Sequence, residues 1–355
     1  MQRIQKIRSI LEEKQIDAIL IKSRSNKRYL GALTGSGVKV LVTRDELYQI
    51  MDGRYSNEAR ETTSGFIMVV HEQGSSYLDE VARLLGSRAR IGIEAGQVLV
   101  KEYLTMQEYG METVLLEHEL EEARRCKDAQ EIALVRKACE ITDAIFQETI
   151  STVRIGMKET EVSALLQYLA IKNGASAMAF DTIVASGVRG CMPHGRPSEK
   201  TLEAHEFITI DFGITYQGYQ SDMTRTVCIQ EPKPELKKIY NIVLEAQCAG
   251  VDFIKAGVKG KDVDAYVRGI IQEQGYGQYF THGLGHGMGM GEGELPMLNA
   301  ASDTVLEEGM IMSCEPGIYV PGLGGVRIED DVLIENGRGV PLNATTKELI
   351  ILEGN

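Results

Sequence analysis

The chain has 355 residues, of which 43% are hydrophobic and 25% charged, as in ordinary globular proteins and unlike disordered, collagenous or coiled-coil chains. It carries 38 lysines and arginines against 51 aspartates and glutamates, a net charge of −13 that repels phosphate backbones and anionic lipid. We therefore expect neither nucleic acid nor a membrane among its partners. At about 150 residues per domain, the length suggests two domains.

The sequence shows no targeting or redox signal. No apolar run approaches the roughly 20 residues that cross a bilayer, and the first six residues lead into an amphipathic segment, not the apolar stretch of a signal peptide. The six cysteines lie far apart and form no Cys-x-x-Cys pair, which favours free thiols over a zinc or redox motif. These features predict a cytoplasmic protein.

The first part of the chain alternates helical and β-rich patterns. Apolar residues at helical spacing predict a helix over 4–11, and a second helical stretch covers 77–85. The β-rich runs are 18–21, 38–42, 66–70 and 91–93. This alternation predicts a small α/β domain. A charged stretch then precedes a new helical pattern near Asp128, so we place the domains at 1–122 and 123–355.

The second part contains an internal repeat. Segment 153–174 resembles segment 254–275 at a constant offset of 101 residues, with glycines at matching positions. Each copy has the pattern of a helix end, a turn and a second helix, and β-rich sequence with two acidic residues follows each. A duplicated supersecondary unit explains this pattern, since two copies are too few for a solenoid. We expect two similar halves with the site in the cleft between them.

In the first half, the β-rich runs 207–213 and 221–226 are typical of two strands joined by a tight turn at Gln217-Gly218. A two-residue turn puts Asp211 opposite Thr224, with Asp222 on the same face of the hairpin. Two like charges on one sheet face are costly unless a cation or a proton lies between them. Solvated hairpin aspartates are the alternative interpretation.

The second half supplies two more acids and two histidines. Glu315 and Glu329 flank a strand-loop-strand pattern and are embedded in apolar sequence. Between the two hairpins, the glycine-rich segment 281–291 carries His282 and His286, and its lack of side chains lets backbone approach a site closely. Four carboxylates plus an imidazole suit two divalent cations such as Mn²⁺, Co²⁺ or Zn²⁺, which activate water for attack on a carbonyl or phosphoryl group. The residues thus predict a two-metal hydrolase without fixing its substrate.

Several short motifs, taken in order, closely resemble the pita-bread metallopeptidases: the Xaa-Pro aminopeptidases, the prolidases and the methionine aminopeptidases. The motifs are PHG at 193–195, DFG at 211–213, SDMTR at 221–225, HGLGHG at 282–287, EPG at 315–317 and VRIED at 326–330. Residues 29–36 resemble the creatinase-type N-terminal domain of the Xaa-Pro branch, a domain that methionine aminopeptidases usually lack. The resemblance implies an α/β N-terminal domain followed by an α+β pita-bread catalytic domain with an internal pseudo-twofold repeat.

The resemblance also implies a set of five metal ligands, Asp211, Asp222, His286, Glu315 and Glu329. Asp222 and Glu329 would bridge two ions, and Asp211 would complete one ion's site. His286 and Glu315 would complete the other. Glu315 would also accept the proton of the attacking water, as a carboxylate beside that water can.

Three further residues match family positions that contact substrate. His194 resembles the histidine that steadies the developing oxyanion. His282 and Arg327 resemble residues of the subsite for the proline side of the scissile bond.

One position departs from the family pattern. Gly293 stands where the family has a second histidine, which is held to bind the substrate carbonyl or the leaving nitrogen. Glu294, Glu292 or a water could substitute for that imidazole.

The function implied is metal-dependent hydrolysis of the bond preceding proline in short peptides, by an Xaa-Pro aminopeptidase or Xaa-Pro dipeptidase. Two divalent ions, Mn²⁺ first and Co²⁺ or Zn²⁺ next, and a homodimer are expected with it. The alternatives are a methionine-type or other aminopeptidase, a low-activity metal-binding relative, a metal-independent creatinase-like amidinohydrolase, and a non-catalytic binding protein.

Overall fold

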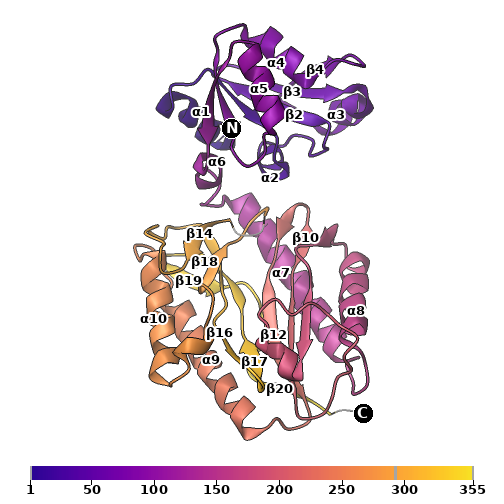
Figure 1. Cartoon of the computed structure of the whole chain (residues 1–355), viewed down its shortest axis with the longest axis vertical. Helices are drawn as coiled ribbons and strands as arrows, with labels where there is room; N and C mark the ends of the chain where they lie inside the picture. Colours follow the sequence, from indigo (N-terminus) through magenta and orange to yellow (C-terminus); the bar gives the residue numbers. More distant parts are fainter. Residues whose placement is uncertain (1, 292–293, 354–355) are drawn as a thin grey trace. The chain divides into compact units, whose positions relative to one another are not determined.

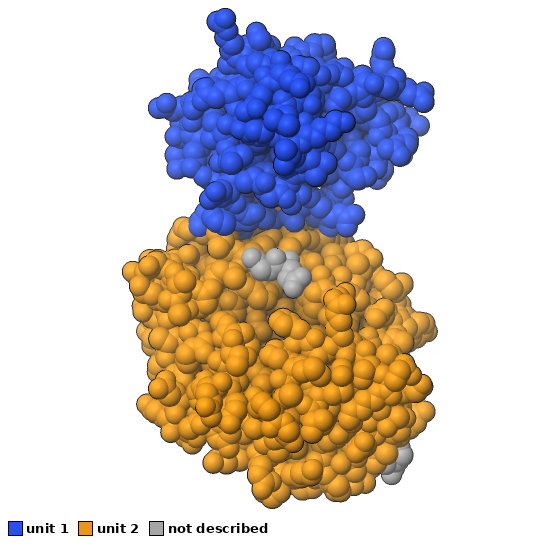
Figure 2. Space-filling view, in the orientation of Figure 1, with its two compact units in different colours: residues 1–124 blue, residues 125–355 orange. Residues whose placement is uncertain are grey.

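A computed structural model describes residues 2–291 and 294–353. The chain divides into two compact units, residues 1–124 and residues 125–355, which Figure 2 colours separately. Within the described residues, no helix combines the length and the apolar composition needed to span a membrane.

The first unit is built on one six-stranded mixed sheet with the strand order β4-β3-β2-β1-β5-β6 (Figure 1). Its strands are β1 (Ala18–Ile21), β2 (Val38–Thr43), β3 (Leu47–Asp52), β4 (Ile67–His71), β5 (Arg90–Glu94) and β6 (Glu112–Leu116). Its helices are α1 (Gln2–Glu13), α2 (Arg24–Tyr29), α3 (Ser56–Thr62), α4 (Tyr77–Leu85), α5 (Val100–Glu108) and α6 (Glu119–Glu122), with a 3₁₀ turn at Gly53–Tyr55. The predicted α/β domain is therefore confirmed.

The second unit packs four long helices around several small sheets (Figure 1). The helices are α7 (Ala129–Ile150), α8 (Glu159–Lys172), α9 (Pro234–Phe253) and α10 (Gly260–Glu273), and 3₁₀ turns lie at Gly187–Cys191 and Gly277–Tyr279. The strands of the first half are β7 (Ala177–Met178), β8 (Ile183–Ser186), β9 (Phe207–Phe212), β10 (Ile214–Tyr216), β11 (Tyr219–Gln220) and β12 (Met223–Ile229). Those of the second are β13 (Gly285–Gly287), β14 (Glu294–Leu298), β15 (Ile311–Cys314), β16 (Gly317–Val320), β17 (Gly324–Arg327), β18 (Asp330–Glu335), β19 (Arg338–Pro341) and β20 (Ile350–Leu352).

The internal repeat appears as two matching helix pairs. Helices α8 and α10 begin at 159 and 260 and end at 172 and 273, so both ends keep the offset of 101 residues seen in the sequence. The turns before them hold Gly156 and Gly257 at φ values of 85° and 90°, a backbone region that glycine occupies without the strain of a Cβ. The predicted α+β catalytic domain with a pseudo-twofold repeat is confirmed.

The hairpin of the first half has the predicted register. Strands β9 and β12 pair antiparallel with Asp211 opposite Thr224. The turn residues Gln217 and Gly218 both have positive φ, as a type I′ turn requires. Gly213, directly after β9, lies against the return strand. A Cβ there would lie 1.8 Å from the carbonyl oxygen of Ser221, so this glycine lets the return strand approach.

Candidate metal centre

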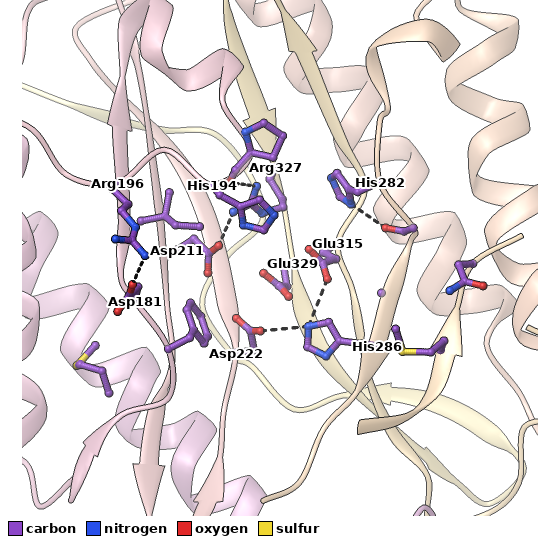
Figure 3. A pocket seen from close by; sticks show the side chains of 18 residues that line it. Asp181, His194, Arg196, Asp211, Asp222, His282, His286, Glu315, Arg327 and Glu329 are labelled. Carbon is purple, nitrogen blue, oxygen red and sulfur yellow. Dashed lines mark hydrogen bonds and ion pairs between the residues drawn. The ribbon is translucent and has the colours of Figure 1, made fainter. Parts of the chain in front are cut away.

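Three carboxylates meet where the two halves of the second unit face each other. Asp211 lies in β9, Asp222 directly precedes β12, and Glu329 lies between β17 and β18. Each offers an oxygen within 4.8 Å of the others, and all three side chains are buried. Residues more than one hundred positions apart thus form one compact acidic cluster (Figure 3).

Each of the three carboxylates has one oxygen that the protein leaves without a hydrogen-bond partner: Oδ1 of Asp211, Oδ1 of Asp222 and Oε1 of Glu329. Burial, together with the neighbouring carboxylates, raises the pKa of Asp222 and of Glu329 well above the usual range. Burial also raises the pKa of Asp211, against the opposing effect of Arg327. Buried, unpartnered oxygens that repel one another are what a divalent cation satisfies, so the residues present fit a metal centre.

His286 and Glu315 lie beside this cluster. The Nε2 atom of His286 is 3.7 Å from Asp222 Oδ2 and 3.6 Å from Glu315 Oε1 (Figure 3). Its Nδ1 lies 3.2 Å from the Gly287 carbonyl, which can only accept, so Nδ1 carries the proton. The Nε2 lone pair is therefore aimed at the carboxylates, the orientation that a histidine ligand needs. The five residues expected as ligands all line one cavity.

Arg327 is buried within the site and its donors go to protein groups. The guanidinium contacts Asp211 Oδ2 and donates to Thr224 Oγ1 at 3.0 Å. It also donates to the Tyr319 hydroxyl at 2.8 Å and to the Pro193 carbonyl at 3.1 Å. These bonds use four of the five N–H donors of Arg327, so it orients Asp211 and Thr224 and keeps one N–H of Nη2 for another partner.

The motifs assign no role to Thr224 or Tyr319, yet both hydroxyls belong to the hydrogen-bond network of the site. The Thr224 hydroxyl donates to Glu329 Oε2 at 2.5 Å, so it fixes the carboxylate that approaches from the other half. The Tyr319 hydroxyl bonds both Arg327 and His282. The alternation of β16 could have indicated that Tyr319 shares a face with Gly317, but its partner His282 comes from outside this hairpin.

The other two histidines differ in their surroundings. His194 is exposed on the cavity wall. His282 is partly buried, with Nδ1 2.7 Å from the Gly283 carbonyl and Nε2 2.9 Å from the Tyr319 hydroxyl. Burial lowers the pKa of His282, which favours the neutral ring with its proton on Nδ1.

The cavity has a volume of about 860 Å³, enough for a short peptide. Its lining combines the proposed metal ligands with apolar and polar side chains. These further lining residues include Met178, Phe180, Ile183, Pro193, Met297 and Asn299.

Comparison with known proteins identifies the family. The model of metallopeptidase family M24 matches residues 133–336, and that of the creatinase/prolidase N-terminal domain matches residues 3–126. The chain belongs to metallopeptidase family M24. A divalent metal ion is therefore part of its chemistry, in agreement with the acidic cluster.

Relatives of this M24 protein match it along nearly its whole length. An Xaa-Pro dipeptidase of Pyrococcus horikoshii is 37% identical, over 98% of this chain and 99% of its own. Among solved structures, an Xaa-Pro dipeptidase from Bacillus anthracis is 41% identical with a TM-score of 0.95, covering 99% of both chains. An X-Pro aminopeptidase from Thermotoga maritima is 36% identical with a TM-score of 0.89, covering 95% of this chain and 98% of its own.

The position where the M24 protein departs from the family motif, Gly293, lies outside the described residues, as does Glu292. Glu294 is described and is buried. Its carboxylate accepts from the Met290 amide at 3.0 Å and lies 3.3 Å from the Lys127 ammonium. Glu294 is thus held by Lys127, and the described residues that line the cavity do not include it. The suggestion that Glu294 replaces the missing imidazole therefore finds no support in its position.

Proposed function

We propose that this M24 protein hydrolyses the peptide bond preceding proline in short peptides and releases the N-terminal residue. The observation that carries the proposal is the buried cluster of three carboxylates with unpartnered oxygens, beside His286 and Glu315, in a cavity of peptide size. The printed names of full-length relatives, Xaa-Pro dipeptidase and X-Pro aminopeptidase, support the choice of bond.

Asp211, Asp222, His286, Glu315 and Glu329 are the proposed ligands of two divalent ions, with Mn²⁺ the first candidate. Such ions polarise the scissile carbonyl and lower the pKa of the attacking water. We further propose that the protein is a homodimer and works in the cytoplasm, as expected from its sequence.

The protein's own groups supply the proton transfers and the orientation. Glu315 is partly exposed to the cavity, so one carboxylate oxygen can take the proton of the attacking water and pass it to the leaving nitrogen. Ser313 donates to Glu315 Oε1 at 3.1 Å and holds that carboxylate in place. His194, which also lines the cavity, is the proposed donor to the developing oxyanion. His282 and Arg327 are proposed for the proline side of the substrate.

The test is a substrate and metal panel on the full chain. Xaa-Pro dipeptides, Xaa-Pro tripeptides and Met-Ala peptides are each assayed with Mn²⁺, Co²⁺ and Zn²⁺, and products are identified by mass. The proposal predicts cleavage before proline, dependent on added metal, and highest with Mn²⁺. Faster cleavage of Met-Ala peptides than of any Xaa-Pro peptide would make the methionine-type alternative the better account, and cleavage of neither would overturn a peptidase function.

A further inference from the structure

Two oppositely charged residues, Arg196 and Asp181, line the same cavity as the metal centre but take no part in it. Arg196 Nη2 lies 2.6 Å from Asp181 Oδ2, and both side chains appear together at one side of the cavity in Figure 3. Their side chains are 79% and 77% exposed. An ion pair so exposed contributes little to stability, so stability does not explain why the pair lies at this position.

The backbone beneath Arg196 is held by a buried network. The backbone carbonyl of Arg196 accepts a hydrogen bond from Arg189 Nη2 at 2.6 Å. Arg189 Nε in turn donates to the fully buried carboxylate of Glu159 at 3.0 Å. That carboxylate also accepts from the amides of Ser186 and Ser198, at 2.7 and 3.0 Å. The segment that presents Arg196 to the cavity is therefore anchored, while the guanidinium itself is in solvent.

The charge of the cavity gives Arg196 a distinct role. The described lining carries five carboxylates and two guanidinium groups, and Arg327 has four of its five N–H donors committed to Asp211, Thr224, Tyr319 and Pro193. A peptide with a free carboxyl terminus brings one more negative charge into this acidic cavity. Arg196, whose one partner on the wall is the solvated Asp181, can give that carboxylate two parallel hydrogen bonds.

We propose that Arg196 binds the carboxylate at the free C-terminus of the substrate, and that Asp181 holds the guanidinium in place until the substrate carboxylate replaces it. The inference rests on the proposed function, because it assigns a binding residue to the C-terminal end of the peptide that the metal centre cleaves at its N-terminal end. The protein should therefore prefer short peptides whose free C-terminus lies within the cavity. It should cleave the same sequences less efficiently when the carboxylate is capped as an amide.

The experiment compares free-acid and amide forms of one Xaa-Pro dipeptide and one Xaa-Pro-Gly tripeptide, with wild type, Arg196→Gln and Asp181→Asn loaded with the same metal. For at least one of the two lengths, we expect the wild type to favour the free acid by about tenfold in kcat/KM, as one exposed charge-assisted bond allows. Arg196→Gln should raise KM for that free acid by about the same factor, leave kcat close to wild type and leave the amide unaffected. Asp181→Asn should lower KM for the free acid, because the competing carboxylate is gone.

Arg136→Gln is the control, since Arg136 forms a partly exposed ion pair with Glu335 and does not line the cavity. Equal use of acid and amide at both lengths by the wild type, or an equal loss on both forms in Arg196→Gln, would overturn the inference while leaving the proposed function intact. If the metal-loaded wild type cleaves no Xaa-Pro peptide in either form, the proposed function itself fails.

Discussion

At the scale of single residues, the unpartnered oxygens of Asp211, Asp222 and Glu329 are the basis of the proposed metal centre. Replacing Asp222 by Asn or Glu329 by Gln keeps the shape of the side chain and removes the charge that a cation needs. We expect either variant to lose tight binding of a metal pair and peptidase activity with it. Metal content of the purified variants is the measurement, and Asp303→Asn, on an exposed acid paired with Lys259, is the control. Two tightly held ions in both variants would contradict the ligand assignment.

Gly293 gives a second prediction at this scale, from the family motif alone. A missing oxyanion donor costs about 2.7–4 kcal/mol of transition-state stabilisation, so turnover should be low for the family. Gly293→His should recover part of the rate on Xaa-Pro peptides, measured as kcat at saturating metal. An unchanged or lower rate in a variant that folds and binds metal normally would show that the site no longer uses a donor at this position.

The sequence could predict which acids and histidine lie together in the cavity, but not what surrounds them. Asp211 and Asp222 follow from the two-residue turn and strand alternation, which are local. Arg327 could be recognised only by resemblance, and its bond to Thr224 depends on how the two halves pack. The Arg196–Asp181 pair had no signal at all, because neither residue belongs to a periodic pattern.

At the scale of elements, the close approach of β9 and the return strand depends on Gly213. A Cβ at this position would lie 1.8 Å from the Ser221 carbonyl oxygen, and overpacking of this kind costs about 1–3 kcal/mol. Gly213→Ala should therefore lower the free energy of unfolding and, because Asp222 follows Ser221 directly, weaken metal binding. Urea unfolding and metal titration measure the two effects.

Gly269, in the middle of α10, provides the matched control. A Cβ there meets no atom within 4 Å, so Gly269→Ala should stabilise the helix by about 0.5–1 kcal/mol and leave metal binding unchanged. Equal stability of the two alanine variants would show that Gly213 is not under steric constraint.

Elements with strong local patterns were predictable, and those defined by long-range contacts were not. The run 18–21 is strand β1 and the stretch 77–85 is helix α4, residue for residue. Strand β3 was missed because its centre is Gln49, a fully buried polar residue whose amide bonds Leu33 and Thr63. Strand β6 was missed because it is an edge strand, where Leu115 is 54% exposed and the alternation of apolar residues is lost.

At the scale of the whole molecule, the buried acids couple stability to pH. Burial raises the pKa of Asp331 to about 8, and burial and neighbouring charge raise that of Asp222 well above its usual range. Because these folded-state values exceed the unfolded ones, the metal-free protein gains stability from both groups at low pH and loses it as pH rises through the raised values. This loss of stability takes place between about pH 4, the pKa of an aspartate in the unfolded chain, and about pH 8, the raised pKa of Asp331.

We therefore expect the urea midpoint of metal-free protein to fall between about pH 5.5 and about pH 7.5, and added Mn²⁺ to reverse the fall. Asp222→Asn, which lacks one of the titrating groups, should show a smaller fall. A midpoint that rises across this range in metal-free wild type would mean that the acids are stabilised as anions by the protein alone.

The central claim is that one cavity holds a metal pair and cleaves the bond before proline. It is tested most directly by titrating metal-stripped protein with Mn²⁺ while following hydrolysis of an Xaa-Pro dipeptide. The account predicts no hydrolysis without metal and a rate that rises until two ions are bound per chain. Full hydrolysis in the stripped protein, or no hydrolysis with both ions bound, would contradict it.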